Sequence, residues 1–325
     1  MDKMPDTDDD TQALAGELGE SPSVIVLSEG DYSGDQHEFD MKRIKDIEQV
    51  FDDPEKIGEA FKSDGVVRCM DGGTEGGLRM AGSGILLPRE KLALPKNHPM
   101  AAFFQKFGVE LIGESEAVLL PNKDYLNILH EKVQQGIIKG ISAHTECGAA
   151  NGDLGRILKS MNIKEEIVAA MVKDSQWQSV VDAHAKLFSE TLALELGVDY
   201  SWIPLEQMTR KSHKHVEEAF YVNLIGGSRP DVAFNSSKLR NDVPNGFTLH
   251  PDLSDPKNTF HRIEISLDIA KVAERFSPQN PFLIVIIDDN KNPRANDEMI
   301  AGTTKAVQKF GDRVIIKKVA ANLGD

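Results

Sequence analysis

Residues 136–147 read GIIKGISAHTEC, an apolar run that starts at a glycine and ends in His-Thr-Glu-Cys. A short apolar run after the helical pattern of residues 124–135 is typical of a buried strand that follows a helix. Residues 65–70, GVVRCM, have the same form, again with a cysteine near the end. Strands that alternate with helices and are apolar enough to be covered on both faces predict an α/β fold, with a mostly parallel sheet flanked by helices.

The alternation continues along the chain. We expect further helices at 41–51, 54–62, 147–161, 164–173, 176–196, 262–276 and 294–310, and further strands at 23–27, 219–225, 282–288 and 313–318. Residues 226–258 are rich in Pro, Asn, Asp and Ser and predict a long loop. No internal repeat is visible in the sequence.

Composition excludes several classes of partner. The chain has 325 residues and a formal net charge of −15, without a run of basic residues, so we expect no nucleic-acid partner. The longest apolar runs, such as residues 281–287, fall far short of the ~20 residues that span a bilayer, so we expect no membrane partner. The N-terminal segment has neither the basic nor the apolar part of a secretory signal, which predicts a cytoplasmic protein.

The chain has only two cysteines, Cys69 and Cys147, and each follows a predicted strand. His144 lies three residues before Cys147. In open α/β sheets, ligand sites form beyond the carboxyl ends of parallel strands. Two thiolates and one imidazole are ligands that zinc accepts, and a catalytic zinc ion typically keeps three protein ligands and one open position. The pattern therefore predicts a zinc site at Cys69, His144 and Cys147.

Other interpretations of these residues stay open. Cadmium or cobalt would also suit the soft thiolate ligands. Buried cysteines often pack as small apolar residues, and a thiol near a histidine can be a nucleophile pair. Because Cys147 begins a predicted helix, we expect the helix N-terminus to lower the pKa of its thiol. Two cysteines kept as thiolates also fit a reducing compartment.

Three motifs follow one another along the chain. They are Cys69-Met70-Asp71-Gly72-Gly73, Arg79-Met80-Ala81-Gly82 and His144-Thr145-Glu146-Cys147-Gly148. In this order they resemble the motifs Cys-x-Asp-x-Arg, Arg-x-Ala-Gly and His-x-x-Cys-Gly of the beta-class carbonic anhydrases, and most closely the zeta, cadmium-using branch of that superfamily. Residues 219–227, AFYVNLIGG, are similar to a Tyr-x-Asn-Leu strand of the same branch. The motifs cover residues 66–150 well and the rest of the chain weakly.

The resemblance implies a zinc-dependent lyase that hydrates carbon dioxide reversibly to bicarbonate by a metal-bound hydroxide. It implies that Asp71 orients this hydroxide and that Arg79 lies near the active site. Gly82 and Ser83 would shape the substrate pocket. The resemblance also suggests a homodimer or higher oligomer that acts on a small molecule. Hydrolysis of a related molecule, such as carbonyl sulfide or carbon disulfide, is an alternative activity.

One position departs from the family pattern. The arginine that normally follows two residues after the aspartate is Gly73 here. In the family this arginine holds the carboxylate away from the metal by a charge-assisted contact. Arg79 could take its place, because the glycine-rich loop between them can fold back; Arg79 could equally pair with a carboxylate at a subunit interface. Without such a partner, Asp71 would become a fourth ligand and close the site, as in a structural or regulatory zinc protein.

These patterns together predict the domain organisation. We expect a disordered acidic segment at residues 1–20, because it has few apolar residues, and a single α/β metal-binding domain at 21–325 with a C-terminal extension from about residue 200. His213 and His215 alternate in a charged segment and could form a second metal site or a proton shuttle, although a solvated surface segment explains them more simply.

Overall fold

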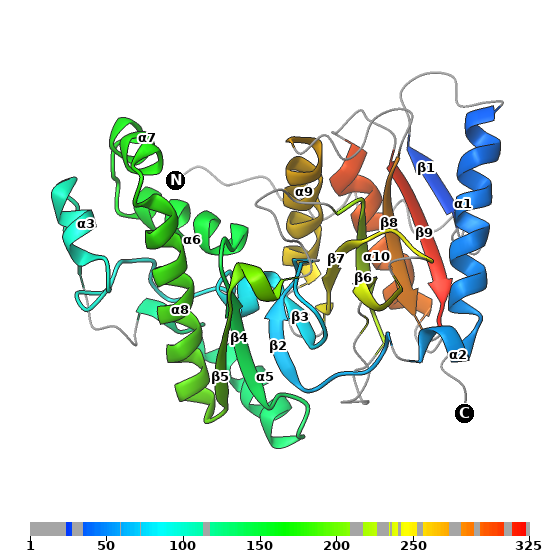
Figure 1. Ribbon diagram of the computed structural model, residues 1–325, viewed down its shortest axis with the longest axis horizontal. Helices are drawn as coiled ribbons and strands as arrows, with labels where there is room; N and C mark the ends of the chain where they lie inside the picture. Colours follow the sequence, from blue (N-terminus) through cyan, green and yellow to red (C-terminus); the bar gives the residue numbers. More distant parts are fainter. Residues whose placement is uncertain are drawn as a thin grey trace, which may run out of the picture.

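A computed structural model describes residues 24–27, 35–58, 60–71, 73–112, 118–208, 217–225, 234, 236–239, 242–251, 256–272, 281–288, 293–308 and 314–322. The predicted acidic segment at 1–20 lies outside the described residues, and so do His213 and His215. Figure 1 shows the arrangement of the described elements.

Helices and strands alternate along the chain, as the sequence predicts. The strands are β1 Val24–Leu27, β2 Val66–Cys69, β3 Leu78–Met80, β4 Gly140–His144, β5 Asp199–Ile203, β6 Ala219–Asn223, β7 Gly246–Leu249, β8 Phe282–Asp288 and β9 Val314–Ala320. The helices are α1 Asp35–Phe51, α2 Pro54–Ile57, α3 Ala101–Lys106, α5 Lys123–Gln134, α6 Gly148–Ser160, α7 Glu165–Lys173, α8 Trp177–Leu196, α9 Pro256–Val272 and α10 Pro293–Val307. Among the described helices, none is long and apolar enough to cross a membrane.

The strands form two sheets (Figure 1). The first has the order β3-β2-β4-β5, and its strands are all parallel. The second has the order β1-β9-β8-β6-β7, in which β1 alone is antiparallel to its neighbour. The predicted parallel α/β class is therefore confirmed, but the chain builds two such sheets where the sequence suggested one.

The two sheets repeat one topology. In chain order the parallel strands of the first sheet are β2 to β5 and those of the second are β6 to β9, and both sets are arranged 2-1-3-4. The sequence hides this repeat because corresponding strand ends carry different residues. The first and third strands of the first sheet end at Cys69 and His144, whereas those of the second end at Asn223 and Asp288.

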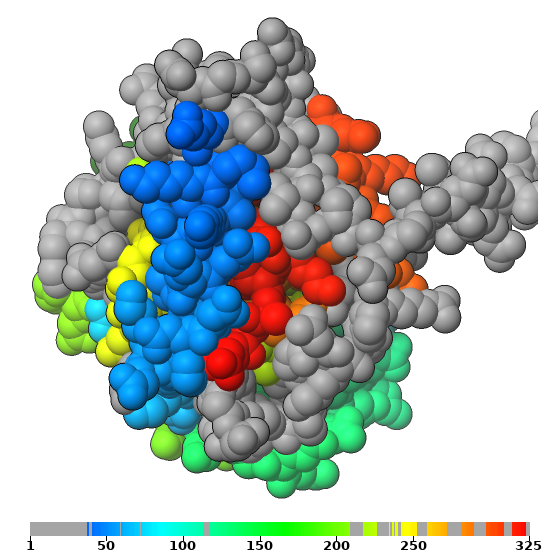
Figure 2. Space-filling model, turned by 90° about the vertical axis from the view of Figure 1, so that its right-hand side faces the viewer, coloured from blue at the N-terminus to red at the C-terminus, as the bar shows by residue number. Residues whose placement is uncertain are grey.

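The central strands of the second sheet are apolar on both faces because helices cover both. Along β8, Leu283, Val285 and Ile287 pack in a cluster with residues of α1. The alternate residues Phe282, Ile284 and Ile286 belong to a cluster with residues of α9 and α10. Figure 2 views the α1 side, where this helix lies beside the end of β9. A continuous apolar run of this kind is expected for a parallel strand between two helical layers.

Main-chain hydrogen bonds join β7 and the residue after it to the segment after β2 and to the edge strand β3. Thr248 N–H donates to the carbonyl oxygen of Met70 at 3.0 Å, and His250 N–H donates to that of Arg79, also at 3.0 Å. One apolar cluster extends from the first sheet to the α9 face of the second. The C-terminal half therefore packs directly against the glycine-rich loop after β2.

Several details of the sequence prediction were wrong. Residues 226–258 are not one loop, because they contain β7 and the start of α9, which begins at Pro256 rather than at 262. The strands β3 and β5 were not predicted. These strands are short, and β5 is partly exposed. Pairing with a neighbouring strand, rather than a periodic apolar pattern, defines them.

Candidate metal centre

The three predicted metal ligands come together between the two central strands of the first sheet. Cys69 ends β2, His144 ends β4, and Cys147 immediately precedes α6. All three side chains are buried, and their ligand atoms lie within 4.8 Å of one another. The two sulfur atoms are 3.9 Å apart. The structure thus confirms a buried group that can hold a metal ion, as expected at the carboxyl ends of parallel strands.

The orientation of His144 fits a metal ligand. Its Nδ1 is 2.8 Å from the carbonyl oxygen of Thr145, an acceptor that requires the proton to be on Nδ1. Its Nε2 is buried and makes no hydrogen bond within the described part of the chain. A hydrogen bond from one ring nitrogen to a main-chain oxygen is the usual way in which a metal-binding imidazole is oriented. A metal ion would give the buried Nε2 a partner.

The two thiols differ in protonation. The hydrogen bond from the Cys147 thiol lowers the pKa of Cys69 well below that of an ordinary thiol; burial opposes this shift, while the His144 charge reinforces it. The bond to Cys69, together with burial, raises the pKa of Cys147 well above its ordinary value. The expected lowering of the Cys147 pKa by the helix N-terminus is therefore outweighed in the metal-free chain by the contact with Cys69 and by burial.

The Cys69 thiolate also acts on the imidazole. Burial lowers the pKa of His144, but the charge of Cys69 outweighs it and raises this pKa to about 9. Gly82 N–H donates to Cys69 Sγ at 3.2 Å and stabilises the thiolate further. The metal-free site therefore holds protons on His144 and Cys147 that a metal ion must displace.

Helix α8 fixes the turn between His144 and Cys147. Asp182 accepts hydrogen bonds from the Thr145 hydroxyl at 2.8 Å and from the Glu146 N–H at 2.9 Å. Glu146 has a φ of 57°, a left-handed conformation that costs energy for a residue with a side chain. Asp182 holds this turn in place. The sequence analysis missed Asp182, whose only signal is a carboxylate within the apolar pattern of a long helix.

Asp71 is buried beside the three ligands, and its charge affects the pKa of each of them. Its Oδ1 accepts a hydrogen bond of 2.6 Å from the main-chain N–H of Gly73. Gly73, which stands where the resembled motif has an arginine, therefore holds the carboxylate through its main-chain N–H.

Arg79 supports the loop that carries Cys69 and Asp71. Its guanidinium donates to the carbonyl oxygens of Cys69 at 2.9 Å, Asp71 at 3.3 Å and Thr74 at 2.7 Å, and to the Thr74 hydroxyl. Its side chain is buried within this chain, so the alternative of a surface pair at a subunit interface does not fit. These contacts hold the main chain of the loop; a direct pair with the Asp71 carboxylate stays a prediction.

Gly82 and Ser83 lie next to the ligands. Both have left-handed φ angles, 56° and 57°. Besides the bond from Gly82 to Cys69, the Ser83 hydroxyl donates to the carbonyl oxygen of Ser142 in β4. These two hydrogen bonds connect the segment after β3 with the ligand Cys69 and with β4. The part of Gly82 and Ser83 in a substrate pocket stays a prediction.

Comparisons with models of protein families, with curated proteins and with solved structures found no match. The function of this site must therefore be argued from its own geometry and chemistry.

Proposed function

We propose that this chain is a zinc-dependent lyase of the beta-carbonic-anhydrase type, which hydrates carbon dioxide to bicarbonate. The observation that carries this proposal is the convergence of Cys69, His144 and Cys147, whose ligand atoms lie within 4.8 Å of one another. Three ligands of this kind match a catalytic zinc site, and the soft thiolates would also accept cadmium or cobalt.

The residues around the three ligands support a catalytic site. When bound, a zinc ion lowers the pKa of water and makes a nucleophile available near neutral pH. We expect Asp71 to accept a hydrogen bond from this water, because its carboxylate is buried next to the ligands and the Gly73 N–H holds its Oδ1. Arg79 keeps the loop in position through its main-chain oxygens. Burial of these groups excludes bulk water and strengthens their electrostatic interactions.

A structural or regulatory zinc protein is the second candidate. It is favoured by the glycine at position 73 and by the burial of Asp71 next to the ligands, which would let this carboxylate close the site as a fourth ligand. Hydrolysis of carbonyl sulfide or carbon disulfide is a third candidate that uses the same residues.

Metal analysis together with stopped-flow hydration of carbon dioxide separates these candidates. We expect about one zinc ion per chain and measurable turnover in the wild type. Asp71→Asn should keep the metal but lose roughly 10²–10⁴-fold in turnover, the range for removal of a proton-accepting group. The control is Glu75→Gln, which changes an exposed carboxylate of the same loop and should leave turnover unchanged.

Two other outcomes would argue against a carbonic anhydrase. Zinc bound without turnover on carbon dioxide between pH 6 and about 10 would favour the structural candidate, unless carbonyl sulfide or carbon disulfide is consumed instead. A chain that binds no metal would contradict all three candidates.

A further inference from the structure

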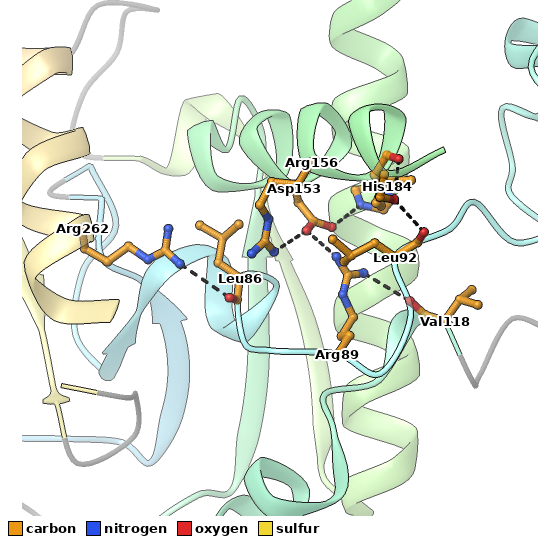
Figure 3. Close-up of polar contacts among 10 residues, drawn as sticks. Leu86, Arg89, Leu92, Val118, Asp153, Arg156, His184 and Arg262 are labelled. Carbon is orange, nitrogen blue, oxygen red and sulfur yellow. Dashed lines mark hydrogen bonds and ion pairs between the residues drawn. The ribbon is translucent and has the colours of Figure 1, made fainter. Parts of the chain in front are cut away.

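A charged cluster lies around α6, the helix that follows the metal ligand Cys147 (Figure 3). Asp153 of α6 is completely buried and accepts hydrogen bonds from Arg89 and, at 2.6 Å, from Arg156. Its second oxygen lies 2.9 Å from His184 Nε2. Burial raises the pKa of Asp153, but these partners outweigh it and hold the pKa at about 2. The carboxylate is therefore charged and already has three partners.

Arg262 reaches the same region from α9, a helix of the second sheet (Figure 3). It is only 5% exposed. Within the described part of the chain its one hydrogen bond is from Nη2 to the carbonyl oxygen of Leu86 at 3.5 Å, the long limit for such a bond. No carboxylate of the described residues lies within 4.0 Å of it. Burial and the nearby charge of Arg156 lower its pKa to about 10, so it remains positively charged at neutral pH.

This arrangement leaves guanidinium donors without acceptors among the described residues. A guanidinium carries five N–H donors, and Arg262 uses one of them weakly. Arg156 Nε is buried and has no hydrogen-bond partner among the described residues. Buried charges in native proteins are paired, because an unpaired charge loses its hydration without compensation. Among the described residues, Arg89 and Arg156 pair with one carboxylate, Asp153, and Arg262 does not contact it.

We propose that Arg156 and Arg262 bind a small planar oxyanion, a carboxylate or bicarbonate, beside Leu86 and between α6 and α9. The planar fork of a guanidinium matches two coplanar oxygen atoms, which is why arginine is the usual partner of such groups. The chain as a whole has a net charge of −15 and repels anions, so binding must come from this local excess of positive charge.

The site connects the two halves of the molecule. Arg156 belongs to the helix that starts after the ligand Cys147, and Arg262 belongs to the second sheet's layer. A bound oxyanion would link these helices. The inference does not depend on the reaction proposed above, although bicarbonate would be the product of that reaction.

Anion titrations of the purified holoprotein test the proposal. Sodium bicarbonate and sodium acetate are the probes, with sodium chloride at equal ionic strength as the reference, and the readouts are isothermal calorimetry and the thermal unfolding midpoint. We expect at least one of the two probes to bind and to raise the midpoint relative to chloride. Arg262→Gln should weaken binding at least tenfold, and so should Arg262→Lys, which keeps the charge but loses the fork.

Two further variants complete the design. Lys271→Gln removes the same charge from an exposed position of α9 and should bind the probes like the wild type. Arg156→Gln changes a partly exposed side chain and carries the test if Arg262→Gln does not fold. The proposal is overturned if neither probe differs from chloride, or if the glutamine variants bind as tightly as the wild type, which would place the anion elsewhere, for example on the metal.

Discussion

Gly82 shows how far a single residue constrains the metal centre. Its φ of 56° lies in the left-handed region, and a Cβ built on it would lie 2.4 Å from Ile85 Cγ2 and 2.8 Å from the Cβ of Ala149. The same Cβ would contact Cys147 Sγ at 3.5 Å. Glycine is therefore required both by the backbone conformation and by the lack of space.

We expect Gly82→Ala to lower the free energy of unfolding by about 2–4 kcal/mol, because left-handed strain and overpacking add. It should also weaken metal binding, since the Gly82 N–H would no longer point at Cys69 Sγ. Urea unfolding and competition with a chelator measure the two effects. Gly155→Ala is the control: it lies within α6 with no atom within 4 Å of its added Cβ, and should be neutral or stabilising. Equal stability of the two variants would contradict this account.

At the scale of elements, a buried histidine pair connects α8 with the segment that precedes α3. The rings of His98 and His184 stack with centroids 5.6 Å apart, and the His98 Nδ1 accepts the N–H of Met100. Burial, with a smaller effect of the His184 charge, lowers the pKa of His98 from 6.5 to about 3. His98 is therefore neutral in the folded chain over most of the acid range.

This shift predicts how stability depends on pH. Between pH 6.5 and about 3 the unfolded chain holds a proton on His98 that the folded chain lacks, so stability falls as the pH falls through this window. His98→Asn keeps an acceptor for the Met100 N–H and should reduce the slope by up to about 1.4 kcal/mol per pH unit. Urea unfolding from pH 7 to pH 4.5 measures it, with the surface residue His130→Asn as control. Parallel pH profiles of the wild type and His98→Asn would refute the prediction.

At the scale of the whole molecule, the second sheet supports the metal loop. His250, directly after β7, accepts the Arg79 N–H with its Nδ1 at 2.9 Å, and its own N–H binds the Arg79 carbonyl oxygen. Its Nε2 lies 2.8 Å from the Asn223 side chain at the end of β6. Arg79 in turn holds the carbonyl oxygens of the loop that carries Cys69. The described part of the C-terminal half thus supports the metal centre, although it supplies none of the three ligands Cys69, His144 and Cys147.

His250→Ala should leave the buried Arg79 N–H without its acceptor and reduce the free energy of unfolding by about 1–3 kcal/mol. Metal affinity should fall with it, because the loop behind Cys69 loses part of its support. Calorimetric metal titration and urea unfolding test both effects, and His261→Ala, an exposed histidine of α9, is the control. Wild-type metal affinity in His250→Ala would show that the second sheet does not support the site.

The ligands could be predicted because their signal is local. Cys69, His144 and Cys147 stand at the ends of apolar strands, and parallel topology brings such ends to one edge of a sheet. His250 and Arg262 gave no such signal, because their contacts with Arg79 and Leu86 join residues 171 and 176 positions apart in the chain. The strand β7 escaped prediction for the same reason: its four residues are a strand through pairing with β6.

The sequence by itself determined the α/β alternation and the soft metal ligands, because apolar periodicity and residue chemistry are properties of short segments. Only the tertiary structure decided that the ligand atoms converge, that Cys69 rather than Cys147 has the lowered pKa, and that Gly73 holds Asp71 through its backbone. It also decided that the C-terminal half repeats the strand order of the first sheet and that Arg262 lies near the charges of Arg156 and Asp153 in α6. These features depend on burial and on distances between segments far apart in the chain, which packing fixes and local sequence does not.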